Sequence, residues 1–300
     1  MTSLLDRYRG CLLGLACGDA VGTTVEFSPR GSFAPVTDMV GGGPFELAAG
    51  QWTDDTSMAL CLATSLVNCE AFDAADQMNR YVNWWQWGYF SSTGDCFDIG
   101  MTVLKALQHF IVTGDPIAGS TDASTAGNGS LMRLAPVVLR YHPDTAAALT
   151  YARKSSATTH GAAEALECCE LLAEVLSNAL AGVDKDDVLR TGLARPAMPR
   201  VAALASADYL DKPAAQIVGS GYSVASLEAA LWCFAHGSDF EETVLMAANL
   251  GDDADTTAAI AGQIAGAFYG VEGIPAPWLD RLHMRGEIDR LACALFERAR

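Results

Sequence analysis

The 300-residue chain has little charge for its size and is poor in basic residues. Only 18% of the residues are charged, and 19 lysines and arginines stand against 36 aspartates and glutamates, giving a formal net charge of −17. A chain this acidic gains nothing from contacts with a phosphate backbone, so we expect no nucleic-acid partner. Most of this acidity serves solubility, and a smaller share falls in short motifs beside apolar helices.

The chain also lacks the cysteine spacings and the long apolar runs of several protein classes. None of its nine cysteines forms a C-x-x-C pair, and Cys168 and Cys169 are adjacent. This odd number argues against a disulfide framework or a zinc knuckle and predicts a protein of the reducing cytoplasm. Charged residues within the first ten positions do not fit a signal peptide. No stretch offers about 20 uninterrupted apolar residues, so no membrane span is expected.

Alternating apolar and polar residues, the pattern of a half-buried strand, are nearly absent. The only candidate for a short strand is Val36–Val40. Apolar residues recur instead at helical spacing, with Gly, Pro, Asn and Asp at the joints. Without a linker or a repeat, the pattern predicts an all-α fold, a compact single-domain multi-helix bundle over residues 1–300. The predicted helices are Tyr8–Val21, Thr53–Cys69, Ala74–Trp87, Asp98–Val112, Leu131–Tyr141, Thr145–Ser155, Gly161–Leu180, Val224–His236, Phe240–Leu250, Thr256–Tyr269 and Glu287–Arg298.

Two acidic motifs stand where a loop enters an Ala-rich helix. Residues 51–56 read Gln-Trp-Thr-Asp-Asp-Thr, and residues 251–257 read Gly-Asp-Asp-Ala-Asp-Thr-Thr. Helix capping is one interpretation, because Asp and Thr are favoured at N-caps and carboxylates in the first turn suit the helix dipole. A cap needs only one acceptor, however, and each motif supplies at least two carboxylates and a hydroxyl.

A metal site is the other interpretation of these motifs. Clustered carboxylates in a buried cleft repel one another and stay ionised only beside a counter-charge, and neither motif contains Lys or Arg. All-oxygen ligands favour Mg²⁺ or Mn²⁺ over zinc. Adjacent helical residues point about 100° apart, so Asp54 and Asp55 could serve two metals. Two ions about 3.5–4 Å apart could activate a water held between them.

Two glycine-rich stretches each precede an apolar helix. Residues 127–133 read Gly-Asn-Gly-Ser-Leu-Met-Arg, and residues 219–223 read Gly-Ser-Gly-Tyr-Ser. Glycine permits close backbone approach, and free N–H groups at a helix start bind anions, so two such loops would suit a diphosphate. Each can equally be a plain turn. Neither is a Walker loop or a Rossmann fingerprint.

Three single residues carry a similar ambiguity. His160 follows two threonines at the start of a long helix, where a lone histidine is usually structural. Glu26 lies among glycines beside Phe27, just after a buried-looking helix, and Asp98 lies in a short loop motif. Both carboxylates can be plain loop residues or caps.

In their order and spacing, these motifs resemble those of the ADP-ribosylglycohydrolase family over residues 7–270. The residues around Asp98, from Ser91 to Gly100, are most similar to the dinitrogenase-reductase-activating branch, which removes ADP-ribose from arginine. The motifs that carry the resemblance lie at residues 18–22 with 26–27, 53–56, 97–100, 127–133, 159–160, 219–222 with 227–232, and 253–256.

The resemblance implies a compact all-α fold with a central cleft that holds two divalent cations, Mg²⁺ or Mn²⁺. The metal ligands it implies are Thr53, Asp54, Asp55, Asp253, Asp255 and Thr256. The ADP-ribose site it implies is lined by Gly127, Asn128, Gly129, Ser130, Met132, Arg133, His160, Gly219, Ser220, Gly221 and Tyr222. The sequence departs from the family at Asp252, which usually is Gly, and at Ala225, where a His often stands.

The predicted function is hydrolysis of the N-glycosidic bond between ADP-ribose and a protein arginine. An ADP-ribosylated protein is then the substrate, and ADP-ribose is a product. Asp98 and Glu26, in that order, are the candidates for proton handling and positioning, while cleft carboxylates such as Asp54 stabilise an oxocarbenium-like charge. Three alternatives stay open: another ADP-ribose linkage (serine or O-acetyl-ADP-ribose), a metal-dependent phosphohydrolase, and a non-catalytic ADP-ribose binder.

Overall fold

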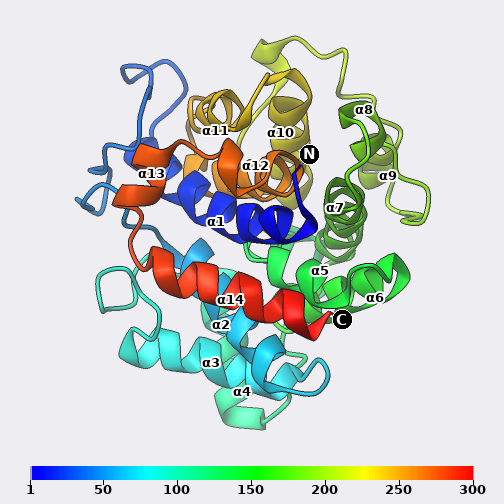
Figure 1. Ribbon diagram of the computed structural model, residues 1–300. Helices are drawn as coiled ribbons and strands as arrows, with labels where there is room; N and C mark the ends of the chain where they lie inside the picture. Colours follow the sequence, from blue (N-terminus) through cyan, green and yellow to red (C-terminus); the bar gives the residue numbers. More distant parts are fainter. Residues whose placement is uncertain (1, 300) are drawn as a thin grey trace.

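The computed structural model describes residues 2–299 as an array of helices (Figure 1). This part of the chain holds four short 3₁₀ helices and three isolated β-bridges but no strand, so the prediction of an all-α fold is confirmed. The α-helices are α1 (Leu4–Gly22), α2 (Asp54–Asn68), α3 (Ala74–Trp87), α4 (Met101–Thr113), α5 (Ala135–Tyr141), α6 (Thr145–Ala157), α7 (Ala163–Ala181), α8 (Lys185–Val188), α9 (Pro199–Ala205), α10 (Ser223–His236), α11 (Phe240–Ala248), α12 (Ala254–Tyr269), α13 (Ala276–Arg281) and α14 (Arg285–Arg298).

Each predicted helix is present, with some ends shifted, and three short helices were not predicted. These are α8, α9 and α13, which have four, seven and six residues. Helices this short do not complete enough turns to show a periodic apolar face. None of the helices among the described residues is long and apolar enough to cross a membrane.

The strand suggested at Val36–Val40 does not form. The backbone N–H of Val36 donates to the side-chain oxygen of Asn249, and the Asn249 amide donates back to the carbonyl of Val36. A side chain therefore satisfies the backbone groups that a neighbouring strand would otherwise pair.

Helices α1 and α12 run side by side through the centre of the molecule (Figure 1). Small residues at every fourth position let their backbones touch: a Cβ on Gly18 would lie 2.1 Å from the carbonyl oxygen of Ala258. The same contact recurs along both helices, which fixes their relative position closely. The paired positions, in antiparallel order, are Gly10 with Gly266, Gly14 with Gly262, Gly18 with Ala258, and Gly22 with Ala254.

This packing brings the end of α1 beside the start of α12. Helix α2 begins at the same place, because backbone N–H groups of its first turn bond to Asp19 in the last turn of α1. One large hydrophobic core, running from Tyr8 to Leu295, surrounds these helices. Three helix ends therefore meet in the interior, and the two acidic motifs lie at two of them.

Candidate metal centre and substrate cavity

Asp19 organises the start of α2. Its Oδ1 accepts from the backbone N–H of Thr53 at 2.9 Å, and its Oδ2 accepts from the N–H of Thr56 at 3.0 Å. The two threonine hydroxyls also bond to this carboxylate, at 2.9 and 2.6 Å. Asp19, fully buried, thus caps α2 from another helix. The sequence analysis placed Asp19 in a motif but not in the site, because a contact between helices has no signal in local spacing.

The capping interpretation of the acidic motifs is wrong for their N-cap residues. Thr53 and Asp253 occupy the N-cap positions of α2 and α12, yet neither side chain makes a cap hydrogen bond. The Thr53 hydroxyl lies 2.9 Å from Oδ1 of Asp19 and 3.1 Å from Oδ2 of Asp255. Asp253 instead accepts from the side-chain amide of Asn128 at 2.5 Å. These side chains therefore face the site rather than their own helix ends.

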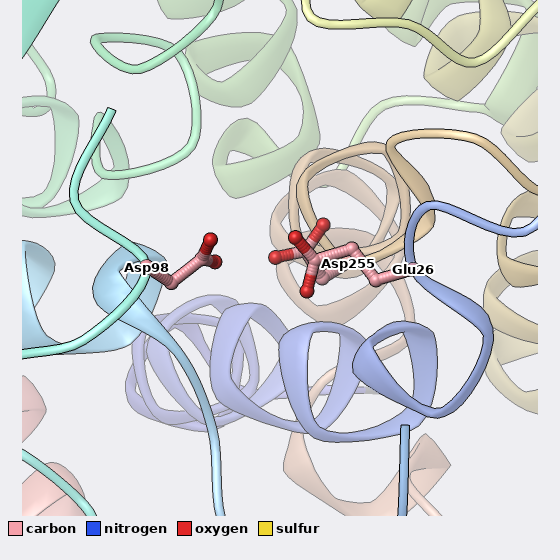
Figure 2. A group of neighbouring side chains, drawn as sticks. All are labelled: Glu26, Asp98 and Asp255. Carbon is pink, nitrogen blue, oxygen red and sulfur yellow. The ribbon is translucent and has the colours of Figure 1, made fainter. Parts of the chain in front are cut away.

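Carboxylates from both motifs and from two loops converge there. Asp54, Asp55 and Asp255 can each offer an oxygen within 4.8 Å of the others, and so can Glu26, Asp98 and Asp255. Figure 2 shows Asp98, on the loop before α4, facing Asp255 and Glu26. Because Asp255 belongs to both groups, two cation positions would be adjacent and share this residue. Thr256 joins the first group through a 3.3 Å hydrogen bond to Asp55.

Three oxygens of these carboxylates lack a hydrogen-bond partner among the residues that the structure describes. Glu26 Oε2, Asp55 Oδ2 and Asp255 Oδ1 are buried without a hydrogen-bond partner. In residues 2–299 none of the clustered acids forms an ion pair with Lys or Arg. Burial and mutual repulsion raise the pKa of Asp54, Asp55 and Asp255 well above the usual range. These residues therefore fit a divalent cation, which supplies the missing positive charge.

Burial and neighbouring negative charges also raise the pKa of the two loop carboxylates, Glu26 and Asp98. Burial, and to a smaller extent repulsion from Asp255, raises the pKa of Glu26 to about 12. Burial, and to a smaller extent repulsion from Asp19, raises the pKa of Asp98 to about 7. Asp98 was predicted at the start of a helix, but it has a left-handed φ of 58° and α4 begins at Met101. This left-handed conformation leaves Asp98 in the loop before α4, with its side chain among the other acids.

A cavity of about 850 Å³ opens above these acids. Of the residues predicted to bind substrate, seven line it: Gly127, Asn128, Gly129, Met132, His160, Ser220 and Gly221. The acidic floor includes Glu26, Asp54, Asp98, Asp253, Asp255 and Thr256, whereas Thr53 and Asp55 lie beneath it. The sequence analysis missed the wall contributed by Phe27, Asp252 and the segment 99–103 at the start of α4.

Four residues predicted to bind substrate lie outside this lining. Arg133, in the segment between α4 and α5, is buried and bonds to Gly129 and Thr159. Ser130 accepts a hydrogen bond from the buried hydroxyl of Ser156. Gly219 packs near Thr257, and Tyr222 lines a smaller adjoining cavity of about 350 Å³. These four residues therefore pack near the cavity lining or, for Tyr222, line the adjoining cavity.

The Asp252 backbone ties the two loops that flank the acids. Its N–H donates to the carbonyl of Ser28 at 2.8 Å, and its carbonyl accepts from the N–H of Phe27 at 2.7 Å. Asp252 has a φ of 54°, a conformation that glycine adopts without strain. A glycine, which the resemblance leads us to expect at this position, would therefore be tolerated here.

The chain is similar to known proteins over nearly its whole length. The family model of ADP-ribosylglycohydrolase matches residues 1–300. A relative from Pseudomonas putida (strain GB-1), named ADP-ribosylarginine hydrolase Tri1, is 48% identical over 98% of this chain and 79% of its own. A relative from Rhodospirillum rubrum, named ADP-ribosyl-[dinitrogen reductase] glycohydrolase, is 31% identical over 95% of this chain and 93% of its own.

A solved structure shows the same fold. Its title is ADP-ribosylglycohydrolase-related protein complex, and it superimposes with a TM-score of 0.87 at 46% identity, covering 99% of both chains. The resemblance based on short motifs is therefore confirmed over the full length. The chain belongs to the ADP-ribosylglycohydrolase family, a family of hydrolases.

Proposed function

We propose that this protein hydrolyses the N-glycosidic bond between ADP-ribose and a protein arginine. The observation that carries the proposal is the buried group of carboxylates at the floor of a cavity of about 850 Å³. Three of their oxygens have no hydrogen-bond partner in the described part of the chain. A cavity of this size accommodates a dinucleotide-sized ligand. The choice of arginine is supported by the 48% identity to a relative named for ADP-ribosylarginine.

We propose two divalent cations, Mg²⁺ or Mn²⁺, as the cofactors of this site. Their ligands would come from Thr53, Asp54, Asp55, Asp253, Asp255 and Thr256, as the family resemblance implies. When bound, such cations orient substrate oxygens and lower the pKa of a water molecule. The grouping of Glu26 and Asp98 with Asp255 adds two carboxylates that can also contact a cation.

The carboxylates around the cavity would act on the reacting sugar. Asp98 and Glu26 come from different loops and point toward each other (Figure 2). They would hold a proton or a ribose hydroxyl. Asp54 at the floor would stabilise the positive charge that develops on the sugar as the bond breaks. The arginine guanidinium can leave as neutral guanidine, so a strong general acid is less necessary.

The mouth of the cavity offers a surface for the departing arginine. The Phe27 side chain is 65% exposed beside Glu26, and its ring packs edge-on against Phe45. A guanidinium stacks favourably on an aromatic face, and nearby carboxylates complement its charge. Other residues of the cavity lining, among them Asn128, His160 and Ser220, would then receive the rest of ADP-ribose.

Matched peptides carrying ADP-ribosyl-arginine or ADP-ribosyl-serine, incubated with and without chelator, test this proposal. We expect the arginine linkage to be cleaved much faster and to yield intact ADP-ribose. Equal or reversed rates would remove the arginine assignment, and release of AMP would point to a phosphohydrolase. Because all nine cysteines are free, we also propose that the protein works in the reducing cytoplasm.

A further inference from the structure

His160 has only one ring nitrogen available to a ligand. Its side chain is 2% exposed, it lines the cavity, and its Nδ1 lies 2.8 Å from the hydroxyl of Thr159. Thr159 is fully buried, so water does not compete for this contact. Nε2 is therefore the nitrogen left to meet a molecule in the cavity, and its protonation decides whether it donates or accepts.

Thr159 is in turn held by a buried arginine. Nη2 of Arg133 donates to the Thr159 hydroxyl at 2.7 Å, and Nη1 donates to the carbonyl of Gly129 at 2.8 Å. The guanidinium also lies over the ring of Tyr81, 4.7 Å from its centre. Among residues 2–299 no carboxylate pairs with Arg133, although it is 1% exposed.

The direction of these hydrogen bonds follows from the chemistry of the groups. A guanidinium can only donate, so the Thr159 oxygen must accept from Arg133. A hydroxyl has a single hydrogen, and the nearest remaining acceptor is Nδ1 of His160. Nδ1 thus accepts, and in a neutral imidazole the proton must reside on Nε2.

We propose that Arg133 and Thr159 are positioning residues that fix His160 as the Nε2–H tautomer, so that His160 donates a hydrogen bond to an oxygen of the bound ligand. The identity of that ligand, ADP-ribose, rests on the proposed function. Its phosphate and ribose oxygens are acceptors of the kind such a donor recognises.

Two further observations support this role. Burial, together with the Arg133 charge, lowers the pKa of His160 to about 3, so the ring stays neutral at physiological pH. The glycine-rich stretch at residues 127–133 also encloses the ring, because a Cβ at Gly129 would lie 2.8 Å from Cε1 of His160. Any larger residue at Gly129 would displace the imidazole, and the enclosed ring has little freedom to turn over and exchange its nitrogens.

This role differs from the one predicted for Arg133 from the sequence. Arg133 was expected to line the ADP-ribose site, but it lies outside the cavity and acts through Thr159. An arginine suits the position because its planar fork reaches the Gly129 carbonyl and the Thr159 hydroxyl together. A lysine ammonium has no such fork.

Nuclear magnetic resonance of ¹⁵N-histidine-labelled protein tests the tautomer directly. A His160→Ala spectrum identifies the His160 signals. We expect a protonated Nε2 and an unprotonated Nδ1 in the wild type and in Thr159→Ser, which keeps the hydroxyl. Thr159→Val removes it and should give mixed tautomers. Arg133→Met removes the donor to the Thr159 hydroxyl, should do the same, and serves as the second variant if Thr159→Val does not fold.

Affinity for ADP-ribose, measured by calorimetry in the presence of Mg²⁺, gives the second readout. Thr159→Val should raise the Kd about tenfold, Thr159→Ser should not, and the metal-induced rise in melting temperature should be equal in both. A single Nε2–H signal with an unchanged Kd in Thr159→Val would overturn the proposal. If the wild type bound no ADP-ribose, the proposed function would fail instead, while the nitrogen signals would still decide the tautomer.

Discussion

The two ends of the α1–α12 pair both carry buried or half-buried charge, but they differ in the partners that the fold provides for that charge. At the first end, Arg7 lies within hydrogen-bond distance of the carbonyls of Ala179, Ala267 and Phe268. These carbonyls belong to the last turns of α7 and α12, where the helix dipole is negative. The fold thus supplies three carbonyl acceptors for this cation.

At the second end, the fold supplies too few hydrogen-bond partners for the clustered carboxylates. The N-termini of α2 and α12 point their positive dipole ends toward the acids, and Asp19 takes up the free N–H groups of α2. Within residues 2–299, one oxygen each of Asp55, Asp255 and Glu26 still has no hydrogen-bond partner. The contrast teaches that a buried charge satisfied by its own fold is structural, whereas one left unsatisfied marks the place of a ligand.

The largest effect is expected from Asp255→Asn, because Asp255 belongs to both carboxylate groups. Hydrolysis of ADP-ribosyl-arginine should fall by about 10³ or more, the upper range for loss of one electrostatic contact. Without metal the variant should melt no lower than the wild type, since it removes one repelling charge. Asp289→Asn, a substitution at the surface acid that pairs with Arg9, is the control. Retained activity in Asp255→Asn would contradict the claim that the unsatisfied acids at this end of the helix pair bind a ligand.

Asp98→Asn should slow turnover by about 10²–10⁴, the usual range for a general acid–base group. Its melting temperature should still rise when metal is added, because the Asp54, Asp55 and Asp255 group remains. Steady-state kinetics and thermal melts measure the two effects on one sample. Loss of the metal-induced rise would make Asp98 a ligand, and full activity would make it a plain loop residue.

At the other end of the helix pair, Arg7→Met should lower the stability of the protein without changing its catalytic activity. Loss of a partly exposed charged donor to helix carbonyls should cost about 1–2 kcal/mol, a fall of a few degrees in melting temperature. The activity of the folded protein should match the wild type. A change in kcat with no change in melting temperature would contradict the structural role assigned to Arg7.

The smallest effect is expected at Phe27, at the mouth of the cavity. Phe27→Leu removes the aromatic face and should lower kcat/KM for an ADP-ribosyl-arginine peptide about two- to fivefold. Phe27→Tyr should be close to the wild type. The Kd for free ADP-ribose, which lacks the arginine, should not change in either variant. A weaker Kd for ADP-ribose would show that Phe27 contacts the nucleotide rather than the leaving group.

The helices and the acidic motifs could be predicted because their signals are local. Repeated apolar positions indicate the helices, and adjacent acids at 54–55 and 252–253 are visible in the sequence. Contacts between distant segments are not visible in this way. The bond from Asp19 to the start of α2 spans 34 residues or more, and the bond from Arg133 to Thr159 spans 26.

The surroundings of Gly129 and the backbone conformation of Asp98 could not be predicted from the sequence, for a physical reason. Gly129 was interpreted as a phosphate contact, and the structure shows in addition that it makes room for the ring of His160. Asp98 was assigned to a helix because apolar residues follow it at helical spacing, yet its left-handed φ places it in the loop before α4. Tertiary contacts decide such positions, and the local pattern does not record them.

The most direct test of the account is a thermal melt and a product assay on wild-type protein freed of metal, before and after Mg²⁺ or Mn²⁺ is added. The account predicts no hydrolysis without metal, restored release of ADP-ribose with it, and a higher melting temperature, since a ligand that binds only the folded state stabilises it. Full activity without metal, together with an unchanged melting temperature on addition, would contradict the claim that the unpartnered carboxylates bind cations.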